Sequence, residues 1–176
     1  MKKIICLFAA VWLTGCSVSY KNQMPIGESF PTVTGNTLEG QTITLPNELN
    51  NKLTLLLVAY KQRSQFDVDR WLIGLDMTNT DVAVYEVPTL RGMFPEIFST
   101  VIDEGMRSGI PKELWQGVIT VYEDGDKIQS FTGNEKPNNT RVVLLDDKGK
   151  VLYFYDRGFS VNALNELRAV IKSNAE

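Results

Sequence analysis

A nearly continuous apolar run at residues 53–60 is the clearest feature in the hydrophobic pattern of this chain. Such a run is typical of a strand that is buried on both faces, as at the centre of an α/β sheet. Polar residues follow, and apolar residues then recur every three or four positions, which predicts a helix over residues 64–77. Ser64 is a candidate N-cap of this helix, and Asp67 at the third helical position would complete a weak capping box.

The rest of the pattern predicts strands and helices in alternation. Strands are predicted in a hairpin within residues 30–46 and at 82–87, 118–122, 140–145 and 151–155, helices at 94–107 and 161–172, and a short turn or helix at 112–116. Tight turns are predicted at residues 123–126 and 146–149. This order resembles the thioredoxin-like α/β architecture, with a central mixed sheet, an N-terminal β-hairpin, flanking helices and a helical insertion.

The first residues of the chain have the order of a secretory leader. Two lysines precede an apolar run at residues 4–13, and the small residue Gly15 then precedes Cys16. The apolar run covers about ten residues, whereas a membrane span needs roughly 20. An ordinary signal peptide that happens to contain a cysteine is one interpretation of this order.

The four residues Leu13-Thr14-Gly15-Cys16 resemble the lipobox of bacterial lipoproteins. The resemblance implies that residues 1–15 are a signal peptide and that Cys16 is acylated, usually with several chains such as palmitate. Ser17 after the cysteine, in place of Asp, implies the periplasmic face of the outer membrane. Residues 16–27 would then be the lipidated cysteine and a tether that, at 3.3–3.6 Å per residue, holds the domain at 28–176 up to about 35 Å from the membrane.

The cysteine and histidine counts narrow the possible chemistry. The chain has two cysteines and no histidine. If the leader is removed, Cys6 leaves with it and Cys16 carries lipid, so the mature chain has no free thiol. This excludes a nucleophile paired with histidine, a thiol peroxidase, a CxxC redox pair and a zinc site of the Cys/His kind. We therefore expect no cofactor and no metal, and an enzymatic role is disfavoured.

The charge balance bears on possible partners. Without Lys2 and Lys3 the mature chain carries 16 basic and 21 acidic residues, a net charge of −5. A nucleic-acid binder needs basic surface to neutralise phosphates, so no nucleic-acid partner is expected. The expected contact with the membrane is the lipid anchor itself. At 43% apolar and 22% charged residues, the composition is that of an ordinary globular domain with a single core.

Three stretches resemble peroxiredoxins and membrane-tethered thioredoxins, namely residues 27–46, the strand at 52–60 and the hairpin at 142–151. In those families the redox cysteines directly follow the central strand, where this chain has the polar residues 61–64. The cis-proline that faces the cysteines would fall near Thr140, and no proline is there. The resemblance therefore implies the fold, whereas the redox and peroxidase activities do not carry over.

A looser resemblance links the chain to the cysteine-free thioredoxin-like branch that includes the mitochondrial ATP-synthase assembly chaperone. It rests on Leu45-Pro46, the strand that ends at Tyr60, Trp71, and residues 106–111. It implies an assembly or chaperone role, with another envelope protein as the partner.

The main candidate site is residues 61–64, the position that holds the redox cysteines in peroxiredoxins and membrane-tethered thioredoxins. A helix N-terminus offers unpaired N–H groups and partial positive charge, which favour anions, and Lys61 and Arg63 would add charge. The functional interpretation is a site for a small anion or a partner's carboxylate. Its candidate residues are Lys61, Gln62, Arg63, Ser64, Asn139 and Thr140. The alternative is a pair of solvated charges on an exposed loop.

Other conspicuous residues are predicted to be structural. Asp67 and Asp69 at i and i+2 of a helix point about 160° apart, which predicts two surface acids. Residues 123–126 lack the further spaced ligands of a calcium loop. Large aromatic side chains are predicted to be core or packing residues, although exposure of Trp115, Met93 and Phe94 would indicate a partner surface. These aromatic residues are Trp71, Phe94, Phe98 and Trp115.

Two functions remain open from the sequence. The first is a membrane-anchored periplasmic lipoprotein whose redox-inactive thioredoxin-like domain acts as a binding or assembly module. The second is an atypical enzyme of the peroxiredoxin and thioredoxin superfamily in envelope redox or stress defence, which would use unfamiliar residues or a partner's thiol.

Overall fold

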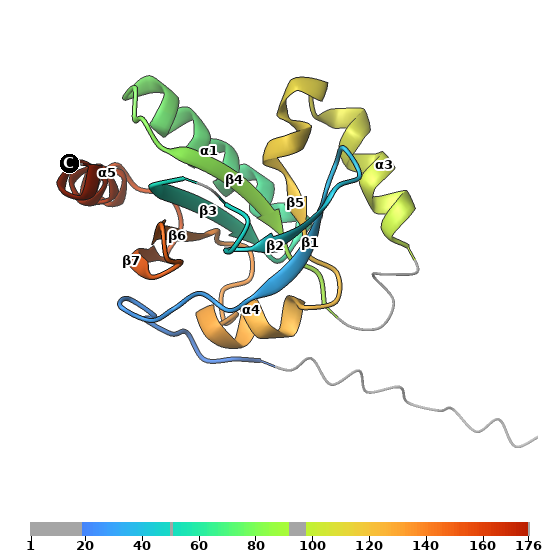
Figure 1. Cartoon of the computed structure of the whole chain (residues 1–176), viewed down its shortest axis with the longest axis horizontal. Helices are drawn as coiled ribbons and strands as arrows, with labels where there is room; N and C mark the ends of the chain where they lie inside the picture. Colours follow the sequence, from blue (N-terminus) through green and yellow to red (C-terminus); the bar gives the residue numbers. More distant parts are fainter. Residues whose placement is uncertain (1–18, 50, 92–97, 176) are drawn as a thin grey trace, which may run out of the picture.

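The computed structural model describes residues 19–49, 51–91 and 98–175 (Figure 1). The strands are β1 Val33–Thr37, β2 Thr42–Leu45, β3 Leu53–Ala59, β4 Ala83–Pro88, β5 Ile119–Thr120, β6 Arg141–Asp146 and β7 Val151–Tyr155. The helices are η1 Gln62–Ser64, α1 Gln65–Met77, α3 Ser99–Gly109, η2 Lys112–Gly117, α4 Gly125–Thr132 and α5 Val161–Ala175.

The central sheet is mixed, with the strand order β4-β3-β6-β7. Strand β3 pairs parallel with β4 and antiparallel with β6, and β6 and β7 form an antiparallel hairpin. The N-terminal hairpin β1–β2 joins β5 in a second, antiparallel sheet, which two isolated parallel bridges link to the region of β4. With α3 and η2 inserted between β4 and β5, this arrangement confirms the predicted fold class.

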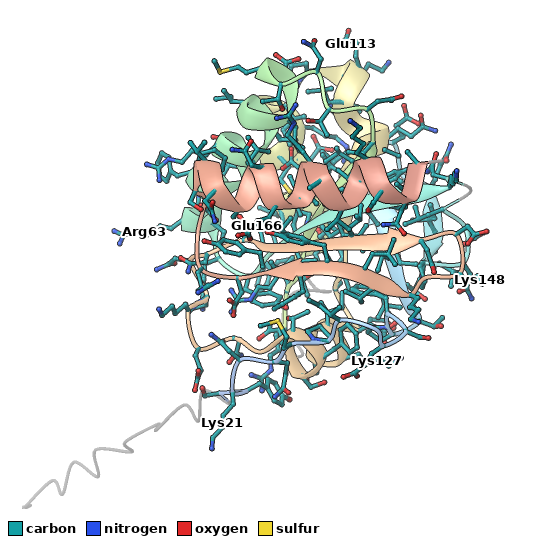
Figure 2. All side chains as sticks on the ribbon, turned by 90° about the vertical axis from the view of Figure 1, so that its left-hand side faces the viewer. Lys21, Arg63, Glu113, Lys127, Lys148 and Glu166 are labelled. Atoms are coloured by element: carbon teal, nitrogen blue, oxygen red, sulfur yellow. The ribbon has the colours of Figure 1, made fainter. Side chains whose placement is uncertain are left out.

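Strand β3 is buried on both faces, as its apolar run predicts. Leu55 and Leu57 pack with Trp71 in a core under α1 and α5. The alternate residues Leu56 and Val58 point to the opposite core, which α4 and the hairpin cover. Figure 2 shows α5 running alongside the strands of the β6–β7 hairpin, in nearly the same direction. Trp71 is fully buried, which confirms its prediction as a core residue.

Helix α4 is the main element that the sequence pattern missed. The residues predicted as a tight turn lead directly into it, and the helix begins at Gly125. Gly125 lies so close to the chain at Leu90 that an added Cβ would come within 1.6 Å of the Leu90 carbonyl oxygen. This close approach explains a glycine, a poor helix former, in the first turn of the helix. Strand β5 is also shorter than predicted.

The aromatic residues of the helical insertion differ in their environments. Trp115 is half-buried, its indole N–H donates to the Ile110 carbonyl oxygen at 2.9 Å, and the Arg107 guanidinium lies 5.7 Å from its ring centroid. Trp115 is therefore a packing residue, as predicted. Phe98 is 53% exposed, so its assignment to the core was wrong. Met93 and Phe94 lie outside the described residues.

Residues 20–28, here called the strap, lie against the domain. The Tyr20 N–H donates to the Asn134 side-chain oxygen at 2.7 Å, and the Asn134 N–H donates to the Tyr20 carbonyl at 3.0 Å. At the other end, the Gly27 N–H donates to the Val151 carbonyl at 2.8 Å. The strap runs beside α4 (dark blue in Figure 1). The part of the predicted tether that the structure describes is therefore bound to the domain. Among the described helices, none is both long and apolar enough to span a membrane.

Candidate functional site

The candidate site lies where β3 ends and α1 begins. The short helix η1 runs directly into α1, so Ser64 already has helical dihedral angles, with φ −64° and ψ −20°. Its hydroxyl does not cap α1 but donates to the Pro137 carbonyl oxygen at 3.0 Å. Ser64 is fully buried by this contact. Ser64 therefore holds the predicted N-cap position, but the capping hydrogen bond is absent, because its hydroxyl donates to a carbonyl 73 residues away.

Asp67 joins the first turn of α1 to two distant loops. Its side chain is buried and accepts the backbone N–H of Thr140 at 2.9 Å and that of Phe159 at 2.7 Å. The prediction that Asp67 is a surface acid was wrong, because it faces the core side of the helix. Asp69 is exposed and accepts a hydrogen bond from the Gln65 side chain at 3.0 Å, as expected for a surface acid.

The loop before β6 packs on Ser64, the innermost of the four residues at the position that redox cysteines would hold. The Asn139 side-chain amide donates to the Asp156 carbonyl at 2.9 Å, which occupies one of its polar groups. Thr140 is fully buried, and its hydroxyl finds no hydrogen-bond partner among the described residues. Neither residue presents a fully exposed side chain to a ligand.

The other candidate residues face solvent. Lys61, Gln62 and Arg63 are all exposed, and Figure 2 shows Arg63 pointing away from the domain. The structure therefore divides the six predicted site residues into two groups. Ser64, Asn139 and Thr140 belong to the closed loop contact, whereas the three residues of the 61–63 segment form an exposed, basic edge beside it.

Below this edge lies a buried guanidinium that sequence reasoning missed. Arg141 is fully buried, and its guanidinium carbon lies 4.7 Å from the Tyr60 ring centroid. Its Nε donates to the Gly133 carbonyl at 3.1 Å, and its Nη1 donates to the Lys136 and Asn139 carbonyls, both at 2.7 Å. Its Nη2 has no partner among the described residues. The signal in the sequence was an arginine directly before the four apolar residues 142–145 of a predicted strand.

The protonation states of Tyr60 and Arg141 favour a structural role for these two residues. Burial raises the pKa of the Tyr60 phenol to about 12, against the opposing effects of the Thr132 hydrogen bond and the Arg141 charge. Burial also lowers the pKa of Arg141, although a guanidinium keeps its proton in proteins. Tyr60 is therefore a neutral phenol at physiological pH and Arg141 is a fixed cation. Arg141 holds the loop through carbonyl groups, Tyr60 contacts α4 through Thr132, and the pair offers no nucleophile or base.

Comparison with protein-family models gives no match, and neither does comparison with curated proteins. Solved structures do match. A putative protein disulfide isomerase from Bacteroides thetaiotaomicron has a TM-score of 0.57 and 18% identity, with 89% of this chain and 93% of the other covered. A SCO1/SenC family lipoprotein from Bacillus anthracis has a TM-score of 0.59 and 13% identity, with 88% and 99% covered. Yeast Sco1 with copper bound has a TM-score of 0.56 and 12% identity, with 86% and 95% covered.

The fold is thioredoxin-like. At these identities the similarity concerns the fold and leaves the activity open.

The copper of yeast Sco1 provides a test of the site. Copper(I) prefers thiolate and thioether ligands, and copper(II) is also bound by imidazole. The six candidate residues include none of these groups, and the described ranges hold no cluster of three or more His, Cys, Asp or Glu side chains placed for a metal. The residues do not fit a copper site of that kind.

Proposed function

We propose that this chain is a lipid-anchored binding module of the bacterial envelope. Cys16 carries the acyl chains, on the periplasmic face of the outer membrane, and the thioredoxin-like domain acts in assembly or as a chaperone for another envelope protein. One observation carries the binding role. At the position of the redox cysteines, the domain's own contacts close only the inner side, from Ser64 to Pro137 and from Asp67 to Thr140. The outer residues 61–63 stay exposed.

The exposed edge at Lys61, Gln62 and Arg63 is the proposed contact for the partner. The whole chain is acidic, so two cations on one exposed edge are a local reversal of its charge. A carboxylate of the partner is the group that such an edge favours. Arginine binds carboxylates with two parallel hydrogen bonds, which would add directionality to the charge attraction.

A turnover assay tests the absence of redox activity. The Cys16→Ser variant without its leader should show background rates in thiol–disulfide exchange and in peroxide reduction. Turnover above background would contradict the proposal and would favour the atypical enzyme.

A crosslinking comparison tests the proposed contact. Proteins crosslinked to the wild type in membranes should be depleted in the Lys61→Glu/Arg63→Glu variant. The variant Lys148→Glu/Lys150→Glu is the matched control, since both lysines are exposed and Lys148 lies at the opposite side of the molecule from Arg63 (Figure 2). The same partner set in all three proteins would contradict a role for the 61–63 edge.

The anchor has its own test. The mass of the N-terminal peptide should show acyl chains on Cys16, and Cys16→Ser should move the protein from the membrane to the soluble fraction. An unmodified cysteine would leave a soluble periplasmic protein instead.

A further inference from the structure

The strap leaves little free chain between the proposed lipid and the domain. Tyr20 is held by two hydrogen bonds to Asn134, and its ring lies 5.4 Å from the Arg91 guanidinium. Gly133, beside this contact, has a φ of +74°, and an added Cβ would come within 2.4 Å of the Asn22 Cα. Four residue steps separate Cys16 from Tyr20, which span at most about 14 Å when fully extended. The strap side of the domain must therefore stay close to the point of anchorage.

Two large apolar side chains are exposed on this short segment. Met24 is 70% exposed and Ile26 is 51% exposed, and they flank Pro25, which is buried against the domain. The strap is fixed on both sides of them, at Tyr20 and at Gly27. Their exposure is therefore maintained by hydrogen bonds and does not arise from a loose chain end. Exposed apolar side chains in such a place indicate a surface that is covered in use.

We infer that the strap lies on the lipid surface, with Met24 and Ile26 inserted between the lipid headgroups. The inference rests on the proposed acylation of Cys16. An acyl anchor within about 14 Å brings the bilayer to this side of the domain, and burial of apolar side chains in the interface adds to the affinity of the anchor. Lys21 of the strap is exposed at one end of the molecule, whereas Glu113 lies at the opposite end (Figure 2). The lysine is placed to meet lipid phosphates.

Fluorescence quenching in vesicles tests this orientation. The full chain is produced with its leader, so that Cys16 is acylated, and a single added cysteine is labelled with a small environment-sensitive dye at Met24→Cys or Ile26→Cys. Met77→Cys is the matched control, because Met77 is 78% exposed at the end of α1 and outside the strap. Each protein is reconstituted in vesicles of phosphatidylethanolamine and phosphatidylglycerol that carry a nitroxide lipid.

Labels at positions 24 and 26 should be quenched several-fold more strongly than the label at position 77. Equal quenching at all three positions, in protein that carries acyl chains and floats with the vesicles, would overturn the inference and leave the anchor intact. The emission of the label at position 24 could instead shift with protein concentration without being quenched. That result would show that a second copy of the protein covers the strap, and it would also overturn the inference. An unmodified Cys16 and loss of flotation would refute the anchor, and the inference would fall with it.

Discussion

Asp67 is expected to be among the most important polar side chains for the stability of this domain. The substitution Asp67→Ala removes the acceptor of two backbone N–H groups, from Thr140 at 2.9 Å and from Phe159 at 2.7 Å. A hydrogen bond to a charged group contributes about 1.5–3 kcal/mol, so the pair contributes about 3–6 kcal/mol. Thr140 is fully buried, so its N–H would stay unpaired, whereas water can reach the half-buried Phe159.

Because only one of the two N–H groups would stay unpaired, Asp67→Ala should lower the free energy of unfolding by about 3–4 kcal/mol, in the lower half of the 3–6 kcal/mol range. For a domain of this size each kcal/mol shifts Tm by roughly 2–4 °C, so Asp67→Ala should lower Tm by about 6–16 °C. Asp67→Asn keeps one carbonyl oxygen and turns an amide N–H₂ toward the other donor, so it should cost roughly 2 kcal/mol.

Urea unfolding followed by tryptophan fluorescence measures both variants. Trp71 is fully buried, and its ring centroid lies 5.3 Å from that of Phe159, so its emission reports on the loop that Asp67 holds. Asp69→Ala is the control, because this exposed carboxylate on the same helix bonds a side-chain amide and should change stability by no more than about 0.5 kcal/mol. If Asp67→Ala costs no more than Asp69→Ala, then the two N–H contacts do not stabilise the domain and the reasoning is refuted.

Three further substitutions test other parts of the structure. Burial raises the pKa of the Glu86 carboxyl, so the native state holds its proton more tightly than the unfolded chain and loses stability as pH rises from the unfolded pKa through the higher native pKa. Glu86→Gln should therefore raise Tm at pH 7 but not at about pH 3, and an equal gain at both would contradict this. Arg141→Leu relieves a buried charge but removes three hydrogen bonds to backbone carbonyls. The free energy of unfolding from urea titration should therefore fall by about 2–4 kcal/mol, and an unchanged urea midpoint would be the contrary result. Gly133→Ala should detach the strap and speed tryptic cleavage after Lys21. Gly40→Ala is the control, because Gly40 also has a positive φ, +88°, but has open space around it, so cleavage should not change. Equal cleavage in both variants would count against strap docking.

The hydrophobic pattern predicted the elements that long apolar runs or clear periodicity define. Strand β3 is the best example, because both of its faces meet a core and every position is apolar or small. Helix α4 was missed because it has only eight residues, opens on a glycine and has few apolar positions. Such a helix owes its stability to packing on the rest of the fold, which no local pattern records.

The candidate site shows where sequence reasoning ends. The 160° separation of Asp67 and Asp69 was correct in geometry, but the helix pattern did not show that Asp67 lies on the buried side. The partners of Ser64 and Asp67 lie between 73 and 92 residues away along the chain. Contacts between residues so far apart in the sequence form only in the folded domain. The contacts of Ser64 and Asp67 with the loop, and the burial of Arg141, could therefore be found only from the structure.

The docked strap also changes how the domain meets other proteins. A free tether of residues 16–27 would let the domain move through a region about 35 Å in radius, whereas the proposed anchor, four residues from Tyr20, would confine it to about 14 Å. The accessible volume falls with the cube of this length, so the local concentration near the anchor rises about 15-fold. With Cys16 acylated as proposed, the strap favours partners that are themselves membrane-bound and diffuse in the same plane, over soluble proteins of the periplasm.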